Sequence, residues 1–159
     1  MIRSVIDHLK ELWRRFIQAH DSPPAMAGGM AIGVFFGFIP VFGLKTLLAL
    51  GTSLVTRSNL IAAVLGVTLH DVFCWSWPFL YRLEFQMGHW ILSNPHQFAP
   101  KLLRTDFRLS EILQWDNFVD VLYPWLLGSI IIAIPFTCLS YVATLIFMYS
   151  REIKKRSLT

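Results

Sequence analysis

Charge is scarce in this sequence, and the little that is present is unevenly placed. Only 15% of the 159 residues are Asp, Glu, Lys or Arg, against about 25% in an average soluble protein. The charges gather near the N-terminal end, in a central stretch and at the C-terminal end, and the segments between carry almost none. With 55% hydrophobic residues and a positive mean hydropathy, this pattern argues against an ordinary water-soluble domain. It predicts a single all-α membrane domain over residues 1–159.

Cysteine and the common catalytic motifs are also scarce. Cys74 and Cys138 lie in apolar segments with no second Cys or His at metal-ligand spacing, which predicts two free thiols and no zinc site. Paired carboxylates at helical spacing, a serine elbow and a glycine-lysine phosphate loop are missing. We therefore expect no enzymatic activity, no bound metal and no cofactor.

The basic residues that give the net charge of +4 stand at the edges of the apolar segments. Lysine and arginine at such positions set membrane orientation and attract anionic lipid headgroups. We therefore expect membrane lipids as partners, and no nucleic acid.

Residues 1–20 have the pattern of an amphipathic helix. Apolar residues recur at three- and four-residue spacing from Ile2 to Ile17, and charged residues fill the opposite face. Such a helix lies in the membrane interface with its basic groups toward the headgroups, or packs on a partner protein.

Residues 25–56 are apolar but interrupted in the middle. Pro40 and Gly43 break the tract into halves of about 13 to 15 residues, roughly 20–23 Å of helix, which is too short for a hydrocarbon core of about 30 Å. Either the tract is one kinked helix, or it is a re-entrant helical hairpin whose apex is at Pro40 and Gly43. Gly29, Gly33 and Gly37 recur every fourth residue on the first arm, a small-residue stripe that allows close helix packing.

Two further segments, 59–81 and 119–149, are each long enough to cross a membrane. Basic residues at both ends of the chain place both termini in the cytoplasm, which requires an even number of crossings. Two spans and a hairpin that returns to its own side satisfy this condition. The predicted segments are, in chain order, an amphipathic helix over 1–20, a re-entrant hairpin over 25–56, a transmembrane helix over 59–81, a loop over 82–118, a transmembrane helix over 119–149 and a basic tail over 150–159.

His70 and Asp71 stand at the centre of the predicted span 59–81. A charged side chain there costs about 2.5–3.5 kcal/mol, so it is expected to face a cavity or a partner. If the hairpin apex reaches the same depth, Lys45 can pair with Asp71, and Thr46 with His70. These four residues are the predicted site, as a structural polar contact or as a site for a ligand or a proton.

The stretch GMAIGVFFGFIPVFGLKTLLAL, followed by RSNLIAAVLG from Arg57 on, resembles the bacterial domain of unknown function 2062 family. The resemblance covers about residues 22–80 and is most specific at Gly33, Gly37, Pro40, Gly43, Thr46 and Asn59. It implies a bacterial multi-pass membrane protein, which we expect in the inner membrane, in some members fused to a glycosyltransferase domain, and it gives no established biochemical activity to carry over. Family members usually have Gln or His in place of Lys45, and Asn-Pro in place of His70-Asp71, so the predicted site departs from the family pattern.

Two functions fit this sequence. The first is a transporter or lipid-handling protein of the cell envelope, whose broken hairpin and polar patch bind an anionic or lipid-linked substrate. A chain this short would need to form a homodimer to enclose a path. The alternative is a non-transporting scaffold that holds an envelope glycosyltransferase or another enzyme at the membrane.

Overall fold

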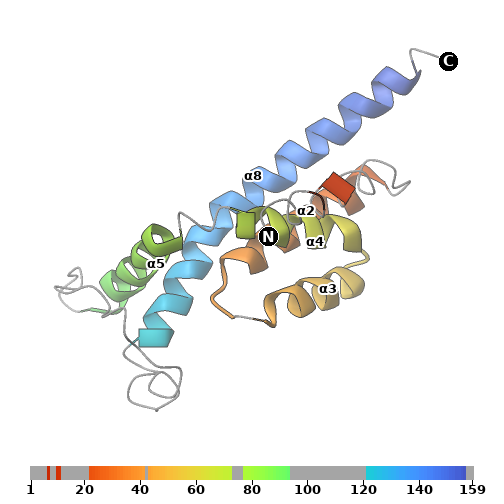
Figure 1. Ribbon diagram of the computed structural model, residues 1–159. Helices are drawn as coiled ribbons and strands as arrows, with labels where there is room; N and C mark the ends of the chain where they lie inside the picture. The colour runs from red at the N-terminus through yellow and green to blue at the C-terminus, as the bar shows by residue number, and fades with distance from the viewer. Residues whose placement is uncertain are drawn as a thin grey trace.

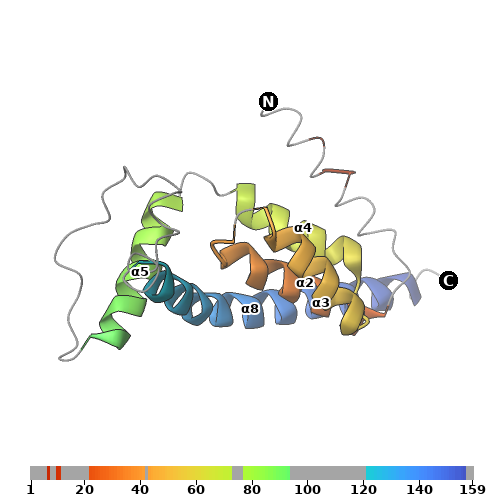
Figure 2. The same ribbon diagram turned by 90° about the horizontal axis from the view of Figure 1, so that it is seen from below.

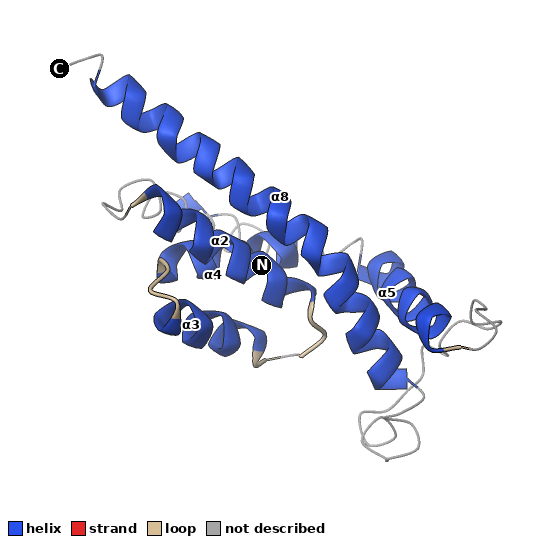
Figure 3. Cartoon of the chain, turned by 180° about the vertical axis from the view of Figure 1, so that it is seen from behind, coloured by secondary structure: helices blue, strands red, loops and turns tan. Residues whose placement is uncertain are grey.

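The computed structural model describes residues 22–41, 43–72, 77–93 and 121–156, together with residues 7, 10 and 11. This part of the chain is all-helical and contains no strand, as the sequence predicts (Figures 1 and 3). Its helices are α2 (Pro23–Phe38), α3 (Lys45–Val55), α4 (Leu60–Val72), α5 (Trp77–Leu92) and α8 (Tyr123–Arg156). The amphipathic helix predicted for residues 1–20 and most of the predicted loop lie outside the described residues.

The apolar tract 25–56 is broken where the sequence predicts. Pro40 biases the residue before it away from helical angles, and Ile39 accordingly has φ −72° and ψ 126° and ends α2. Gly43, with φ +83°, then allows the chain to turn, because glycine reaches this region without the clash that a Cβ would cause. Hence α2 and α3 form a helical hairpin rather than one continuous helix.

The first arm of this hairpin, α2, runs parallel to α4 at very close range. Cβ atoms added at Gly29 and Gly33 would overlap the backbone carbonyls of Asn59 and Ala63, and one at Gly66 of α4 would lie 2.6 Å from the carbonyl oxygen of Met30. Small residues on both helices therefore let the two backbones meet directly.

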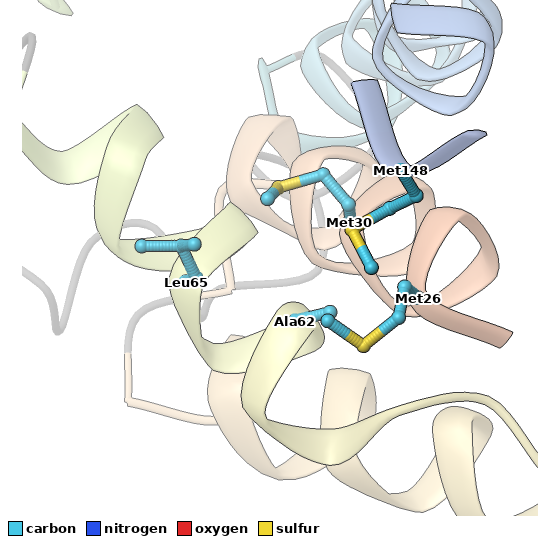
Figure 4. Packing of buried hydrophobic residues seen from close by; sticks show 5 residues of the cluster. All are labelled: Met26, Met30, Ala62, Leu65 and Met148. Atoms are coloured by element: carbon cyan, nitrogen blue, oxygen red, sulfur yellow. The ribbon is translucent and has the colours of Figure 1, made fainter. Parts of the chain in front are cut away.

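The longest helix, α8, packs against α2 along one part of its length and against α5 along another (Figures 1 and 2). Near its C-terminal end Met148 packs with Met26 and Met30 of α2 and with Ala62 and Leu65 of α4, as Figure 4 shows. Further toward its N-terminus, Ile132 and Ala133 pack against Phe38 at the end of α2. The two helices are therefore antiparallel.

The N-terminal part of α8 packs on α5 instead. A Cβ added at Gly88 of α5 would overlap the backbone of Pro124, and one at Gly128 of α8 would overlap the backbone of Glu84. In consequence α5 covers one half of α8, whereas the hairpin and α4 gather beside the other half (Figure 2).

The described residues from 59 to 93 differ from the prediction. Instead of one helix over 59–81, α4 ends at Val72 and α5 begins at Trp77, with residues 73–76 outside the described part. The predicted loop is helical as far as Leu92, where apolar Met87 packs against the core beside α8. Residues 150–156 of the predicted basic tail also continue α8, since Arg, Glu and Lys are good helix formers.

Among the described helices, α8 is the one that is long and apolar enough to cross a membrane, over Tyr123–Ile153. Only 11% of its most apolar 18-residue window is buried, unlike the core helix of a soluble protein. Large side chains such as Leu139 and Ile146 are 66% and 61% exposed. This unburied apolar surface indicates membrane association.

Candidate functional site

The predicted site residues Lys45 and Asp71 are brought together by the hairpin. Lys45 is the first residue of α3, directly after the turn, and Asp71 lies in the last turn of α4. The Lys45 ammonium donates a hydrogen bond to Asp71 Oδ1 and forms an ion pair with it. The Lys45 side chain is 14% exposed and that of Asp71 is 38% exposed, so the carboxylate keeps an accessible side.

His70 lies beside this pair, buried against α2. Its side chain packs over Gly37, where a Cβ would approach the His70 Cβ to 2.8 Å, and its ring centroid is 4.8 Å from that of Phe38. His70 Nδ1 is 3.7 Å from Asp71 Oδ1. Thr46, the fourth predicted residue, is partly buried in the first turn of α3, next to Lys45. The ends of three helices thus meet at one polar cluster, formed by Lys45, His70 and Asp71.

The polar cluster lies level with the middle of α8. The ring of Phe38, next to His70, stacks on the ring of Phe136 with centroids 5.0 Å apart. Phe136 is about 20 Å along the helix axis from Tyr123 and about 26 Å from Ile153, at 1.5 Å per residue. If α8 crosses a membrane, the cluster is therefore near the middle of the bilayer.

The predicted apex residues differ in their roles. Pro40 is buried and precedes the turn, whereas Gly43 is exposed, with nothing within 4 Å of a Cβ built on it. Gly43 is therefore required for its positive φ and not for lack of space. Its neighbour Leu44 exposes 53% of its surface.

An apolar groove that the sequence analysis did not predict runs between α2, α4 and α8. It has a volume of about 290 Å³ and is lined by Met30, Val34, Leu69, Ser140, Ala143, Thr144 and Phe147. Residues that recur every fourth position supply the walls on α2 and α8, so helical spacing was the available signal. Leu69 of α4 lines this groove and is followed in the chain by His70 of the polar cluster, so the groove and the cluster are neighbours along α4.

Glu84 on α5 is a fully buried acid outside the polar cluster. It is 0% exposed between α5 and α8, and Trp125 Nε1–H donates a hydrogen bond to its Oε2 at 2.8 Å. Glu84 lies on α5, beyond the predicted span 59–81. Burial raises the pKa of Glu84 to about 7, although the hydrogen bond from Trp125 lowers it. Its other oxygen, Oε1, has no hydrogen-bond partner among the described residues.

The described side chains include no group of three or more His, Cys, Asp or Glu placed to hold a metal ion. Cys138 is a free cysteine on the exposed surface of α8, and Cys74 lies outside the described residues.

Comparison with known proteins gives a family but no characterised relative. No curated protein and no solved structure matches the chain. A family model described as "Uncharacterized protein conserved in bacteria (DUF2062)" matches residues 7–157, nearly the whole sequence. The resemblance seen in residues 22–80 therefore extends through α8, and the chain belongs to this bacterial family.

Proposed function

We propose that this chain is a multi-pass protein of the bacterial inner membrane that binds an anionic or lipid-linked substrate at the polar cluster of Lys45, His70 and Asp71. The observation that supports the proposal is the Lys45–Asp71 ion pair. It joins the start of α3, directly after the hairpin turn, to the end of α4, level with the middle of α8. Broken helices at membrane depth are a recurring means of presenting polar groups to a substrate.

The packing along α8 supports a hairpin that returns to its own side of the membrane. From Met148, which contacts the start of α2, to Ala133, which contacts its end, α8 rises by about 22 Å. This is less than the roughly 30 Å of a hydrocarbon core, so α2 stops inside the membrane and α3 leads back. α4, and then the start of α5, would make the second crossing, antiparallel to α8.

The positions of the basic residues support two cytoplasmic termini. Asn59, two residues after Arg57, donates its backbone N–H to the carbonyl of Ala25 at 2.9 Å, at the end of the molecule where Met26 packs on Met148. Arg57 thus lies at the same end as the basic residues that follow Met148 in α8. Under the positive-inside rule this is the cytoplasmic end.

The substrate class follows from the two neighbouring features. The ammonium of Lys45 is paired with the carboxylate of Asp71, which an anionic group of a substrate can replace. The apolar groove ends on α4 one residue before His70 and offers a surface for a hydrocarbon chain of the same molecule. A phosphate linked to a polyprenyl chain combines both requirements.

Reconstituted protein provides the test. Liposomes with purified wild-type protein should bind or move a polyprenyl phosphate, and Lys45→Gln should abolish this activity while insertion remains normal. Arg82→Gln removes one exposed positive charge from α5 and serves as the matched control. Ala143→Phe, which fills the groove, should weaken binding of the lipid-linked substrate. Wild-type protein that neither binds nor moves it would refute the proposal.

A scaffold for an envelope glycosyltransferase is the second candidate, favoured by the outer face of α3. Leu47, Leu54 and Val55 are 63%, 64% and 85% exposed, while Ala49 and Ser53 face the other helices. A scaffold would tolerate Lys45→Gln, but Leu47→Glu would prevent recovery of the enzyme in pull-downs. If the partner is recovered equally with Leu47→Glu, this second role is excluded.

A further inference from the structure

The turn between α3 and α4 lines a second cavity, which is open to the surface, at the end of the hairpin opposite to Lys45. Its volume is about 390 Å³, and it is lined by Ser53, Leu54, Arg57, Ser58, Asn59, Leu60 and Ile61. Lys45 and Ser53 are eight residues apart on α3, so about 12 Å of helix separates this cavity from the polar cluster. The proposed function assigns no role to it.

The backbone of the turn holds Arg57 in a costly conformation. The N–H of Ser58 donates to the carbonyl of Ser53 at 2.8 Å, and the N–H of Arg57 donates to that of Leu54 at 3.2 Å. This is the hydrogen-bond pattern of a Schellman motif, which usually has glycine at the left-handed position. Here that position is Arg57, with φ +54°. The carbonyls at the end of α3 are therefore satisfied within the turn and are not directed at the cavity as acceptors.

Ser53, one of the lining residues, carries a buried hydroxyl group. Its side chain is 0% exposed, and its Oγ has no hydrogen-bond partner among the described residues. A buried hydroxyl without a partner costs free energy, so its presence on a cavity wall points to a ligand that accepts a hydrogen bond from it.

The charge around the cavity is positive. The exposed guanidinium of Arg57 forms no ion pair with any side chain in the described part of the chain. Leu60 and Ile61 on the wall are the first residues of α4, whose N-terminal end carries a partial positive charge. The parallel helix α2 begins beside it, because the Asn59 N–H binds the carbonyl of Ala25. Among the described lining residues no acidic side chain opposes these charges.

We infer that the α3–α4 turn is a binding site for a phosphate group, held by the Arg57 guanidinium, the Ser53 hydroxyl and the N-terminal end of α4. Helix N-termini and arginine side chains both bind phosphate, and their combined positive charge favours an anionic ligand over a neutral one. The phosphate can belong to an anionic lipid or be free in solution. Leu54, which lines the cavity, and Val55, the next residue, are exposed and supply a contact for the acyl chains of a lipid.

This site can be tested separately from the polar cluster. Full-length protein in detergent would be titrated with short-chain phosphatidic acid by native mass spectrometry, and with inorganic phosphate by calorimetry. Arg57→Gly should weaken binding about tenfold or more, through loss of a charge-assisted hydrogen bond, and Ser53→Ala about fivefold. Neither variant should unfold the protein, because glycine suits the positive φ and alanine removes an unpaired polar group.

Matched variants distinguish this site from general attraction to anions. Arg57→Lys should retain most of the affinity, and Arg151→Gln, which removes one positive charge from α8, should retain it entirely. In the Lys45→Gln background, which removes binding at the polar cluster, Arg57→Gly should still weaken the remaining phosphate binding about tenfold. Binding of phosphatidic acid without inorganic phosphate would identify a lipid headgroup, and equal binding of both would identify a soluble phosphate. Wild-type protein that binds neither, or equal losses in Arg57→Gly and Arg151→Gln, would overturn the inference.

Discussion

Trp125 of α8 donates its indole N–H to the fully buried carboxyl group of Glu84 on α5, at 2.8 Å. The two residues are 41 positions apart in the sequence. Backbones meet on both sides of this contact, at Gly128 and Gly88, and Glu84 is 0% exposed. Glu84 is therefore held in an environment that disfavours its charge.

The stability of the α5–α8 contact should depend on pH. Since burial raises the pKa of Glu84 from 4.5 to about 7, the folded protein binds a proton that the unfolded chain releases between these values. The free energy of unfolding should accordingly fall as the pH rises from about 4.5 to about 7, and change little from this group above that range. Thermal unfolding in detergent at pH 5 and pH 8 measures the difference.

Glu84→Gln provides the control for this effect. The amide keeps an oxygen that accepts the Trp125 hydrogen bond but does not titrate, so the difference between pH 5 and pH 8 should shrink. A variant with the same pH dependence as the wild type would show that Glu84 does not titrate in this range. Trp125→Phe, which removes the donor but leaves the acid, should retain the pH dependence at lower overall stability.

Close packing of α2 on α4 predicts a large cost for one added methyl group. Gly33→Ala would direct a Cβ into the backbone carbonyl of Ala63, and forcing apart such a contact costs about 1–3 kcal/mol. Gly51→Ala is the matched control, because Gly51 is exposed on α3 with nothing within 4 Å of the added Cβ. It should stabilise the protein by about 1 kcal/mol through helix propensity. Equal unfolding temperatures for the two variants would contradict the packing.

The Lys45–Asp71 pair predicts a larger loss from one substitution than from two. Asp71→Asn leaves the ammonium of Lys45, 14% exposed, without its carboxylate. Because Asp71 itself is 38% exposed, we expect a cost of about 2 kcal/mol, below the 3–5 kcal/mol of a fully buried pair. Lys45→Met combined with Asp71→Leu should recover part of it. A double-mutant cycle that compares Lys45→Met, Asp71→Leu and the double variant by their free energies of unfolding measures the coupling. A coupling of zero would show that the two side chains do not interact.

The parts of the structure that could be predicted depend on local chemistry. The helix break at Ile39 follows from the proline after it, and the spacing of Gly29 and Gly33 indicates a face for close packing. The position of Lys45 opposite Asp71 could be inferred from depth, since the cost of burying each charge is reduced by the other.

The parts that could not be predicted depend on distant contacts. Arg82 and Glu84 have the composition of a loop, but Glu84 is helical and buried because Trp125 and the backbone of α8 cover it. The apolar groove needs side chains from three helices, and no local pattern indicates which faces they present to one another. The sequence around Ser53 indicates only an ordinary helical serine, because its burial depends on the turn that follows α3.

Arg57 offers a last prediction that links backbone strain to the phosphate site. A non-glycine residue in the left-handed region costs about 1–2 kcal/mol, so Arg57→Gly should raise the free energy of unfolding by about 1 kcal/mol after the greater freedom of glycine in the unfolded chain is included. Arg57→Ala keeps the Cβ and therefore the strain, and should give no such gain. If both variants are equally stable, relief of strain is excluded as the cause. A gain for glycine alone, together with loss of phosphate binding in both variants, would show that the arginine is held at the expense of stability and that its side chain binds the ligand.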